Sequence, residues 1–144
     1  MGATGAKGIG GFMSIESGIV TKLTSAATNA GSRIYPLVSP HGAAFPHLLY
    51  QRITTLRINS HDGPSGLANP SFQVTCIATT HLAASTLADQ VRQALDGDAS
   101  TWDDTVVGAC FCENEVDLGG EQASGDADFI YSIAMDFSIW HEET

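Results

Sequence analysis

One serine stands in a sequence context that nucleophilic catalysis uses. Ser65 lies in the segment Gly63-Pro64-Ser65-Gly66-Leu67, which resembles the GxSxG nucleophile elbow of hydrolases. The elbow requires glycine where this chain has Leu67, and it places its serine on a turn between a strand and a helix. This segment instead joins two predicted strands. We therefore expect no hydrolase site at Ser65.

The glycine-rich N-terminus resembles a phosphate-binding loop only in composition. Lys7 is followed by Gly8 rather than by the Ser or Thr of a Walker motif, and no predicted strand precedes it. In the partial GxGxxG pattern that begins at Gly8, Met13 occupies the position of the last glycine. We interpret residues 1–13 as a flexible Gly-rich arm.

Metal-ligating residue types are present, but their spacing matches no metal-binding motif. The histidines form no HExxH pair, and we interpret them as surface or loop residues. The acidic runs 96–104 and 113–117 resemble calcium loops, but the sixth position, glycine in an EF-hand, is Thr101 in one and Leu118 in the other. The sequence thus predicts no catalytic residue, metal ion or cofactor. The five histidines are His41, His47, His61, His81 and His141.

The three cysteines match neither a zinc motif nor a redox CxxC pair. Cys76 alternates in step with the apolar residues of a predicted strand, which indicates a core position. Cys110 and Cys112 flank Phe111, so both thiols should point to one face of a strand and Phe111 to the other. We expect three unreactive thiols in a reducing compartment.

Charge is sparse and unevenly distributed along the chain. The 144 residues are 43% hydrophobic and only 15% charged, and this length fits one domain. Residues 1–92 hold six Lys or Arg and three acids, whereas residues 93–144 hold thirteen acids and no Lys or Arg, which gives the net charge of −10. This balance excludes a large nucleic-acid-binding surface, because such binding needs basic residues to replace counterions. No stretch approaches the roughly 20 apolar residues of a membrane span, and no secretory signal is expected.

Two segments have the 3.6-residue periodicity of amphipathic helices. The first begins at Ser14 as N-cap and ends near Asn29 and Gly31. The second spans residues 80–95 and ends at Gly97.

Alternation predicts strands at 33–35, 48–58, 72–78, 105–112 and 129–139, with a turn-rich connection at 59–70 and an acidic loop at 113–128. In the strand at 48–58, Leu48, Tyr50, Leu56 and Ile58 should share one face. The order predicts a single α+β domain over residues 14–144, a two-layer sandwich of a mainly antiparallel sheet with two helices packed on one face. The predicted core consists of Phe72, Val74, Leu87, Val91, Leu95, Ile133, Met135 and Phe137.

Several stretches, in order and spacing, resemble the tail-terminator (tail-completion) proteins of long-tailed bacteriophages and gene-transfer particles. The match extends over roughly residues 14–141, and the Gly-rich arm and the long acidic loop depart from it. The stretches are Arg33-Ile34-Tyr35-Pro36 with Pro40, Gly42, Pro46, Tyr50, Gln51 and Arg52; Asp62-Gly63-Pro64-Ser65-Gly66-Leu67; the helix end Leu95-Asp96-Gly97; and Met135-Asp136-Phe137-Ser138-Ile139-Trp140-His141.

The resemblance implies a structural virion protein and not an enzyme. Its homohexameric ring would cap the tail tube at the head-proximal end, stop polymerisation and join the tail to the head connector protein. The genome would pass through the bore without specific binding, and assembly would take place in the host cytoplasm. Two alternatives stay open: another head–tail connector component, such as a stopper or adaptor, and a small enzyme.

The charge asymmetry suggests where subunits would meet. We expect the basic segment of one subunit to face the acidic segment of its neighbour or of an axial partner. The candidate interface residues are Arg52, Arg57, His61, Asp62, Gly63, Pro64, Ser65, Glu113, Glu115 and Asp117.

Overall fold

The computed structural model describes residues 15–60, 63–103, 105–122 and 129–142, in two helices and six strands. None of the helices in these ranges is long and apolar enough to cross a membrane. In chain order the elements are α2 (Ile15–Ser25), β1 (Ile34–Pro36), β2 (His47–Ser60), β3 (Gly63–Ala78), α3 (His81–Leu95), β4 (Thr101–Trp102), β5 (Thr105–Gln122) and β6 (Phe129–Glu142).

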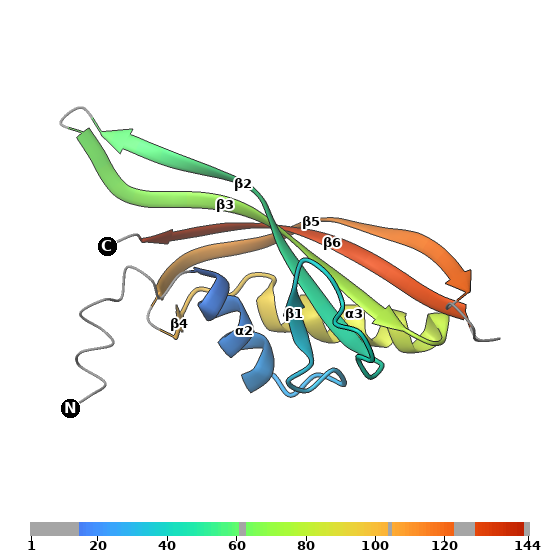
Figure 1. Ribbon diagram of the computed structural model, residues 1–144. Coiled ribbons are helices and arrows are strands. Elements are labelled where there is room, and N and C mark those ends of the chain that lie inside the picture. Colours follow the sequence, from blue (N-terminus) through green and yellow to red (C-terminus); the bar gives the residue numbers. More distant parts are fainter. Residues whose placement is uncertain (1–14, 61–62, 104, 123–128, 143–144) are drawn as a thin grey trace.

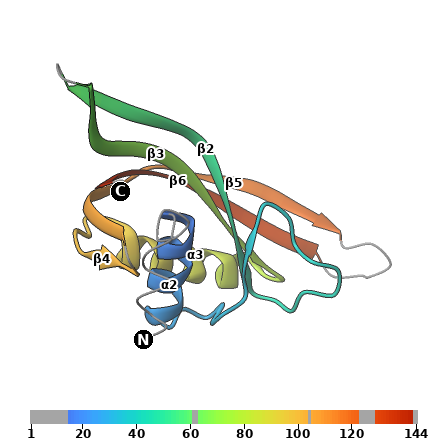
Figure 2. The ribbon, with the colours of Figure 1, turned by 60° about the vertical axis from the view of Figure 1, so that its left-hand side comes forward.

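The strands form one mixed sheet in the order β1-β2-β3-β6-β5-β4, with β1 parallel to β2 and the other pairings antiparallel (Figure 1). Both helices lie on the same side of this sheet (Figures 1 and 2). The predicted α+β class is confirmed. The predicted two-layer sandwich of mainly antiparallel strands is wrong in form, because the mixed sheet curls into a half-barrel around the helices. Long strands accumulate right-handed twist, and β-bulges in β2 and β5 bend them further.

The hydrophobic core lies between the helices and the hollow face of the sheet. All eight predicted core residues are at most 2% exposed, so that prediction is confirmed. Ile15, Ile19 and Leu23 of α2 join them at helical spacing. Gly18 lets α2 approach the chain at Trp102, since a Cβ on Gly18 would lie only 2.9 Å from the Trp102 carbonyl oxygen.

The ends of α3 are defined by side chains and a glycine. The Thr80 hydroxyl accepts a hydrogen bond from the Ala83 N–H, as an N-cap should. At the other end the Asp96 N–H donates to the Arg92 carbonyl, and Gly97 takes a φ of +79°. The chain then turns back along the edge of β5.

The β2–β3 hairpin is much longer than predicted. The expected turn-rich connection at 59–70 is wrong, because β2 continues to Ser60 and β3 begins at Gly63. Asn59 pairs with Pro64, and the described pairing of β3 with β6 begins only at Leu67. The start of β3 therefore has a described neighbour on one side only, where a proline can be accommodated.

Because of a β-bulge in β2, the residues predicted to share one face of this strand do not all do so. The register shifts between Arg52 and Thr54, and the inserted residue reverses the alternation beyond it. Leu48 is buried, but Leu56, predicted on the same face, is 57% exposed.

The predicted acidic loop at 113–128 is largely strand. β5 continues to Gln122 and pairs with β6 along this length. Acidic side chains are tolerated here because every described residue from 113 to 118 is exposed. Residues 123–128 lie outside the described part of the chain.

Candidate functional site

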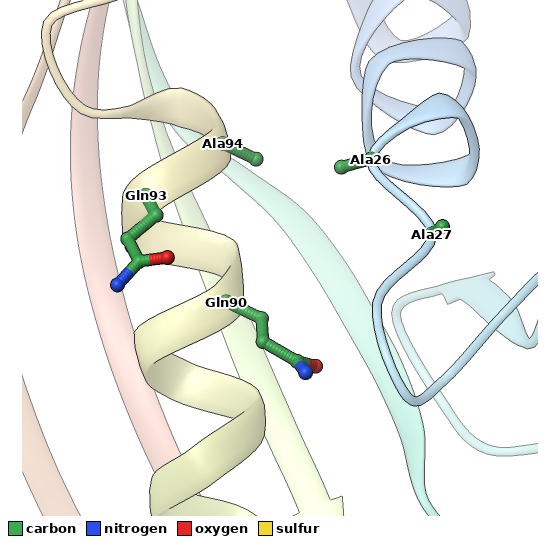
Figure 3. A pocket seen from close by; sticks show the side chains of 5 residues that line it. All are labelled: Ala26, Ala27, Gln90, Gln93 and Ala94. Carbon is green, nitrogen blue, oxygen red and sulfur yellow. The ribbon is translucent and has the colours of Figure 1, made fainter.

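A shallow hollow lies between the end of α2 and the side of α3 (Figure 3). It encloses about 270 Å³ and is lined by Ala26, Ala27, Gln90, Gln93 and Ala94. Gln90 also ties the two elements together, because its side-chain oxygen accepts from the Asn29 N–H at 2.8 Å. Methyl and amide groups supply neither a nucleophile nor a proton-transfer group, so this hollow has no catalytic residue.

The thiols have no features of reactive cysteines. Burial raises the pKa of Cys76, and burial with the nearby carboxylates of Asp96 and Asp98 raises the pKa of Cys110 to about 12. Desolvation also raises the pKa of Cys112. The thiolate, which is the reactive form, is therefore scarce near neutral pH. Within the described ranges, no three His, Cys, Asp or Glu side chains are grouped to hold a metal ion.

His47 has a structural role. The surface-or-loop interpretation is wrong for His47 and His141, because both lie in strands and are buried. The His47 Nδ1–H donates to the Ala44 carbonyl at 2.9 Å, so Nε2 accepts the Ser39 hydroxyl at 2.7 Å. Desolvation lowers the pKa of His47, despite the bond to Ala44. The neutral ring packs against the rings of Phe45 and of Tyr35 in β1.

The carboxylate of Asp98, in the first acidic run, has hydrogen-bond donors and a cationic partner within its own chain. One oxygen accepts from the Trp102 indole N–H and the Ser100 hydroxyl, each at 2.6 Å, and the other lies 3.4 Å from Lys22 Nζ. Burial opposes ionisation, but these donors and the Lys22 charge together lower the pKa of Asp98. The carboxylate thus joins α2 to the turn before β4.

The candidate interface residues from the basic half of the sequence lie along the β2–β3 hairpin. Arg52 is in the middle of β2, Arg57 is near its end, and residues 63–65 begin β3. His61 and Asp62 lie outside the described residues. The hairpin projects beyond the helices, away from the rest of the sheet (Figures 1 and 2).

Arg52 contacts its own subunit on several sides. Nη1 donates to the Thr55 hydroxyl at 3.2 Å, Nη2 lies 3.9 Å from a Glu16 carboxylate oxygen, and the guanidinium carbon lies 5.4 Å from the centre of the Phe72 ring. The buried Nε has no hydrogen-bond partner among the described atoms. These contacts anchor the arginine at the point where the hairpin leaves the sheet.

The acidic candidates lie toward the opposite edge of the sheet from β2. Glu113, Glu115 and Asp117 are exposed residues of β5, which β6 and β3 separate from β2. Asp117 Oδ2 lies 3.4 Å from His81 Nε2, at the first residue of α3. Among the described residues, the structure therefore does not bring the acidic and basic candidates together within one subunit.

The edge of β5 is covered over its first half only. Val107 donates its N–H to the Ser100 carbonyl, the Cys110 carbonyl accepts from Gly97, and the Cys112 N–H donates to an Asp96 carboxylate oxygen. β4 pairs with the residues just before. For residues 113–122, which we name the open β5 edge, no backbone partner outside β6 occurs among the described residues.

The edge of β2 is divided in the same way. β1 pairs with residues 48–50, and Leu37 donates its N–H to the Tyr50 carbonyl. Residues 51–60, which we name the open β2 edge, pair with β3 on one side and with no other described backbone segment. Sequence reasoning missed both open edges. An edge is open where the neighbouring strand, β1 or β4, is too short to cover it, and the residues of β2 and β5 do not show how long that neighbour is.

Most of the described basic side chains are neutralised locally. Arg92 lies 2.6 Å from the neighbouring helix residue Asp89, Arg52 faces Glu16, and Lys22 faces Asp98. The Lys22–Asp98 pair alone among these three joins the basic and acidic halves of the sequence. Glu113, Glu115 and Asp117, the acids of the open β5 edge whose side chains are described, face no described Lys or Arg.

A polar row crosses the face of the sheet that has no helix. Gln51, Gln73, Asp136 and Asn114 lie in register on four strands. The amides of Gln73 and Asn114 each donate to a different oxygen of Asp136, both at 3.5 Å. Sequence reasoning did not single out this row. Gln51, Gln73 and Asp136 occupy polar positions of predicted strands, but Asn114 falls in the predicted acidic loop.

These features define a small α+β protein whose distinctive surfaces are strand edges and an uncovered sheet face. The family model described as "Tail completion protein gp17" matches residues 19–142. The chain belongs to this tail completion family, which confirms the resemblance found in the sequence and makes the protein a structural component of a virion tail.

A solved structure titled "Virion of native gene transfer agent (GTA) particle" contains a similar chain. The TM-score is 0.59 at 17% sequence identity, over 83% of this chain and 84% of that chain. At this identity the similarity shows a shared fold. No curated protein sequence matches this chain significantly.

Proposed function

We propose that the protein forms a homohexameric ring that caps the tail tube, stops its polymerisation and joins the tail to the head connector protein. The observation that carries the proposal is the family match over residues 19–142. A tube of stacked rings presents the same growing end after every addition, so termination requires a ring with a different outer face. The partners are further copies of the chain, the tail tube protein and the connector protein.

The charge of the chain suits a ring through which the genome passes without specific binding. The net charge is −10, and no Lys or Arg follows Arg92. Affinity for DNA depends on basic residues that displace counterions, so a surface without them does not hold the moving polyanion. In this proposal the ring lies at the head-proximal end of the tail and assembles in the host cytoplasm.

Deletion of the gene tests the proposal directly. Electron microscopy of the mutant lysate should show overlong tails, or tails that are not joined to heads, and a plasmid copy of the gene should restore normal particles. Native mass spectrometry of the purified protein or of the isolated cap should show six copies. Head-attached tails of uniform length in the deletion lysate would reject the function.

A further inference from the structure

We propose that neighbouring subunits join their sheets edge to edge, with the open β2 edge of one copy pairing with the open β5 edge of the next. The partner is therefore a second copy of this chain. The inference deepens the proposed function and rests on its ring, because it specifies the contact that closes the ring.

Both edges are ready for strand addition. An open edge exposes a row of unpaired N–H and C=O groups, and proteins usually cover, shorten or charge such rows with lysine. Here the apolar side chains beside them are also exposed: Ile53 and Leu56 by 48% and 57% on β2, and Val116 and Leu118 by 42% and 59% on β5. Pairing the two edges would satisfy the backbone groups and remove these side chains from water.

Charge selects which edges meet. The open β2 edge contains no acid and two arginines, Arg57 and Arg52, of which Arg52 also faces Glu16 of its own subunit. The open β5 edge contains four acids and no Lys or Arg. Pairing two β5 edges would place acid against acid, and pairing two β2 edges would place arginine against arginine. Like charges directly opposite each other destabilise a strand pair, so the mixed β2–β5 contact is favoured. The acids are Glu113, Glu115, Asp117 and Glu121.

The topology gives this contact a direction. The open β2 edge and the open β5 edge lie at opposite edges of one sheet. Their pairing is therefore head to tail, which is the type of contact that closes a ring. Three antiparallel pairings separate β2 from β5, which makes the two strands antiparallel to each other. A copy rotated about the ring axis keeps that direction, so the strands at the new contact are antiparallel as well.

The shape of the sheet matches such a contact. Each open edge begins beside a β-bulge, between Arg52 and Thr54 in β2 and between Cys112 and Asn114 in β5. The open edges lie toward opposite ends of the sheet (Figure 1). The neighbour is therefore displaced along the strands, and the strands cross the ring wall obliquely, as staggered strands do in a barrel.

Cysteine cross-linking tests the contact, because a continuous sheet fixes which side chains share a face. Leu56 pairs with Asn69 and Val116 pairs with Ala134, and both positions lie on the face without helices. In a Cys112→Ser background, a mixture of Leu56→Cys and Val116→Cys proteins treated with a short bismaleimide should form covalent dimers that neither variant forms alone. Thr54→Cys samples a second register on the same face.

Phe111→Cys is the matched control. Phe111 is 51% exposed on the same face of β5, but the strand edge there is covered by residues 96–97. It should not cross-link to position 54 or 56. Equal cross-linking at positions 111 and 116 would overturn the inference. So would an intact oligomer with no cross-link at 116, or a protein that stays monomeric at every concentration.

Charge exchange gives a second readout. Arg57→Glu and Glu115→Arg should each weaken self-association about tenfold or more, and the double variant should recover most of the loss. Arg92→Glu, on α3 beside Asp89, should leave association unchanged. Losses that simply add in the double variant would contradict the inference. Edge pairing that fails these tests while the deletion still gives uncapped tails would leave the proposed function standing.

Discussion

β5 is one strand with two halves that have different environments. In the first half, residues 105–112, buried and exposed side chains alternate and the edge is covered by β4, Gly97 and Asp96. In the second half the described side chains, residues 113–118, are all exposed and the edge is open. β2 repeats the division, since β1 covers residues 48–50 and leaves 51–60 open.

The difference separates residues that stabilise the subunit from residues that are available for assembly. Substitutions around the covered halves should lower the free energy of unfolding of the monomer. Substitutions on the open edges should leave it nearly unchanged and act on self-association.

The largest effect is expected where the covered half of β5 meets the core. Phe137 is fully buried and pairs with Cys112. Phe137→Ala should lower the free energy of unfolding by about 3–5 kcal/mol through lost burial and a new cavity. Val116→Ala, on the open edge, should change it by less than about 0.5 kcal/mol. Denaturant unfolding measures both, and equal effects would contradict the division of β5.

The second largest effect on stability is expected where α2 packs against β4, the short strand that covers the start of β5. A Cβ at Gly18 would lie 2.9 Å from the Trp102 carbonyl oxygen and 3.1 Å from its Cβ. Gly18→Ala should therefore destabilise the protein by about 1–3 kcal/mol, although alanine is the better helix former. Thr21→Ala, at an exposed position of the same helix, is the control. A more stable Gly18→Ala protein would show that α2 does not press against β4.

A smaller effect is expected at the boundary between the two halves of β5. Asp96 accepts the Cys112 N–H at 2.9 Å, the last described bond on the covered edge. Asp96→Ala should cost about 1 kcal/mol and should speed hydrogen exchange of the Cys112 amide. Asp89→Ala, which removes only an exposed pair with Arg92, should leave that exchange rate unchanged. Slow Cys112 exchange in the Asp96 variant would mean that another group covers this amide.

The smallest effect is a pH dependence from the covered half of β2. Since burial lowers the pKa of His47 in the folded state, the unfolded chain takes up the proton first as the pH falls. The free energy of unfolding should thus decline below about pH 6.5, by at most about 1.4 kcal/mol per pH unit for one proton. His47→Gln should flatten this part of the stability profile. A profile unchanged by the substitution would show that His47 is not the titrating group.

Sequence periodicity correctly predicted which face of a single helix or strand lies against the core. The stripe of Leu87, Val91 and Leu95 and the alternation through Phe137 identified core faces correctly. The face of Leu56 was wrong because one bulged residue reverses the alternation, and sequence pattern does not mark where a bulge occurs.

The errors about the candidate site have a related cause. Acidic or turn-forming residues suggest loops, but a strand with few tertiary neighbours tolerates them, as the open β5 edge and the start of β3 show. The burial of His47 depends on the carbonyl of Ala44 and the hydroxyl of Ser39, which only the folded loop brings to its ring. Whether an edge is open is decided by its neighbours in space and not by its own residues.

Hydrogen exchange of the free subunit and of the assembled ring tests the central claim most directly. In the free subunit, outward-facing amides of residues 51–60 and 113–122 should exchange fast, whereas those of residues 105–112 and 48–50 should exchange slowly. On assembly, the open β2 edge and the open β5 edge should both become protected, and the covered halves should change little. Fast exchange at both open edges in the intact ring would contradict the account.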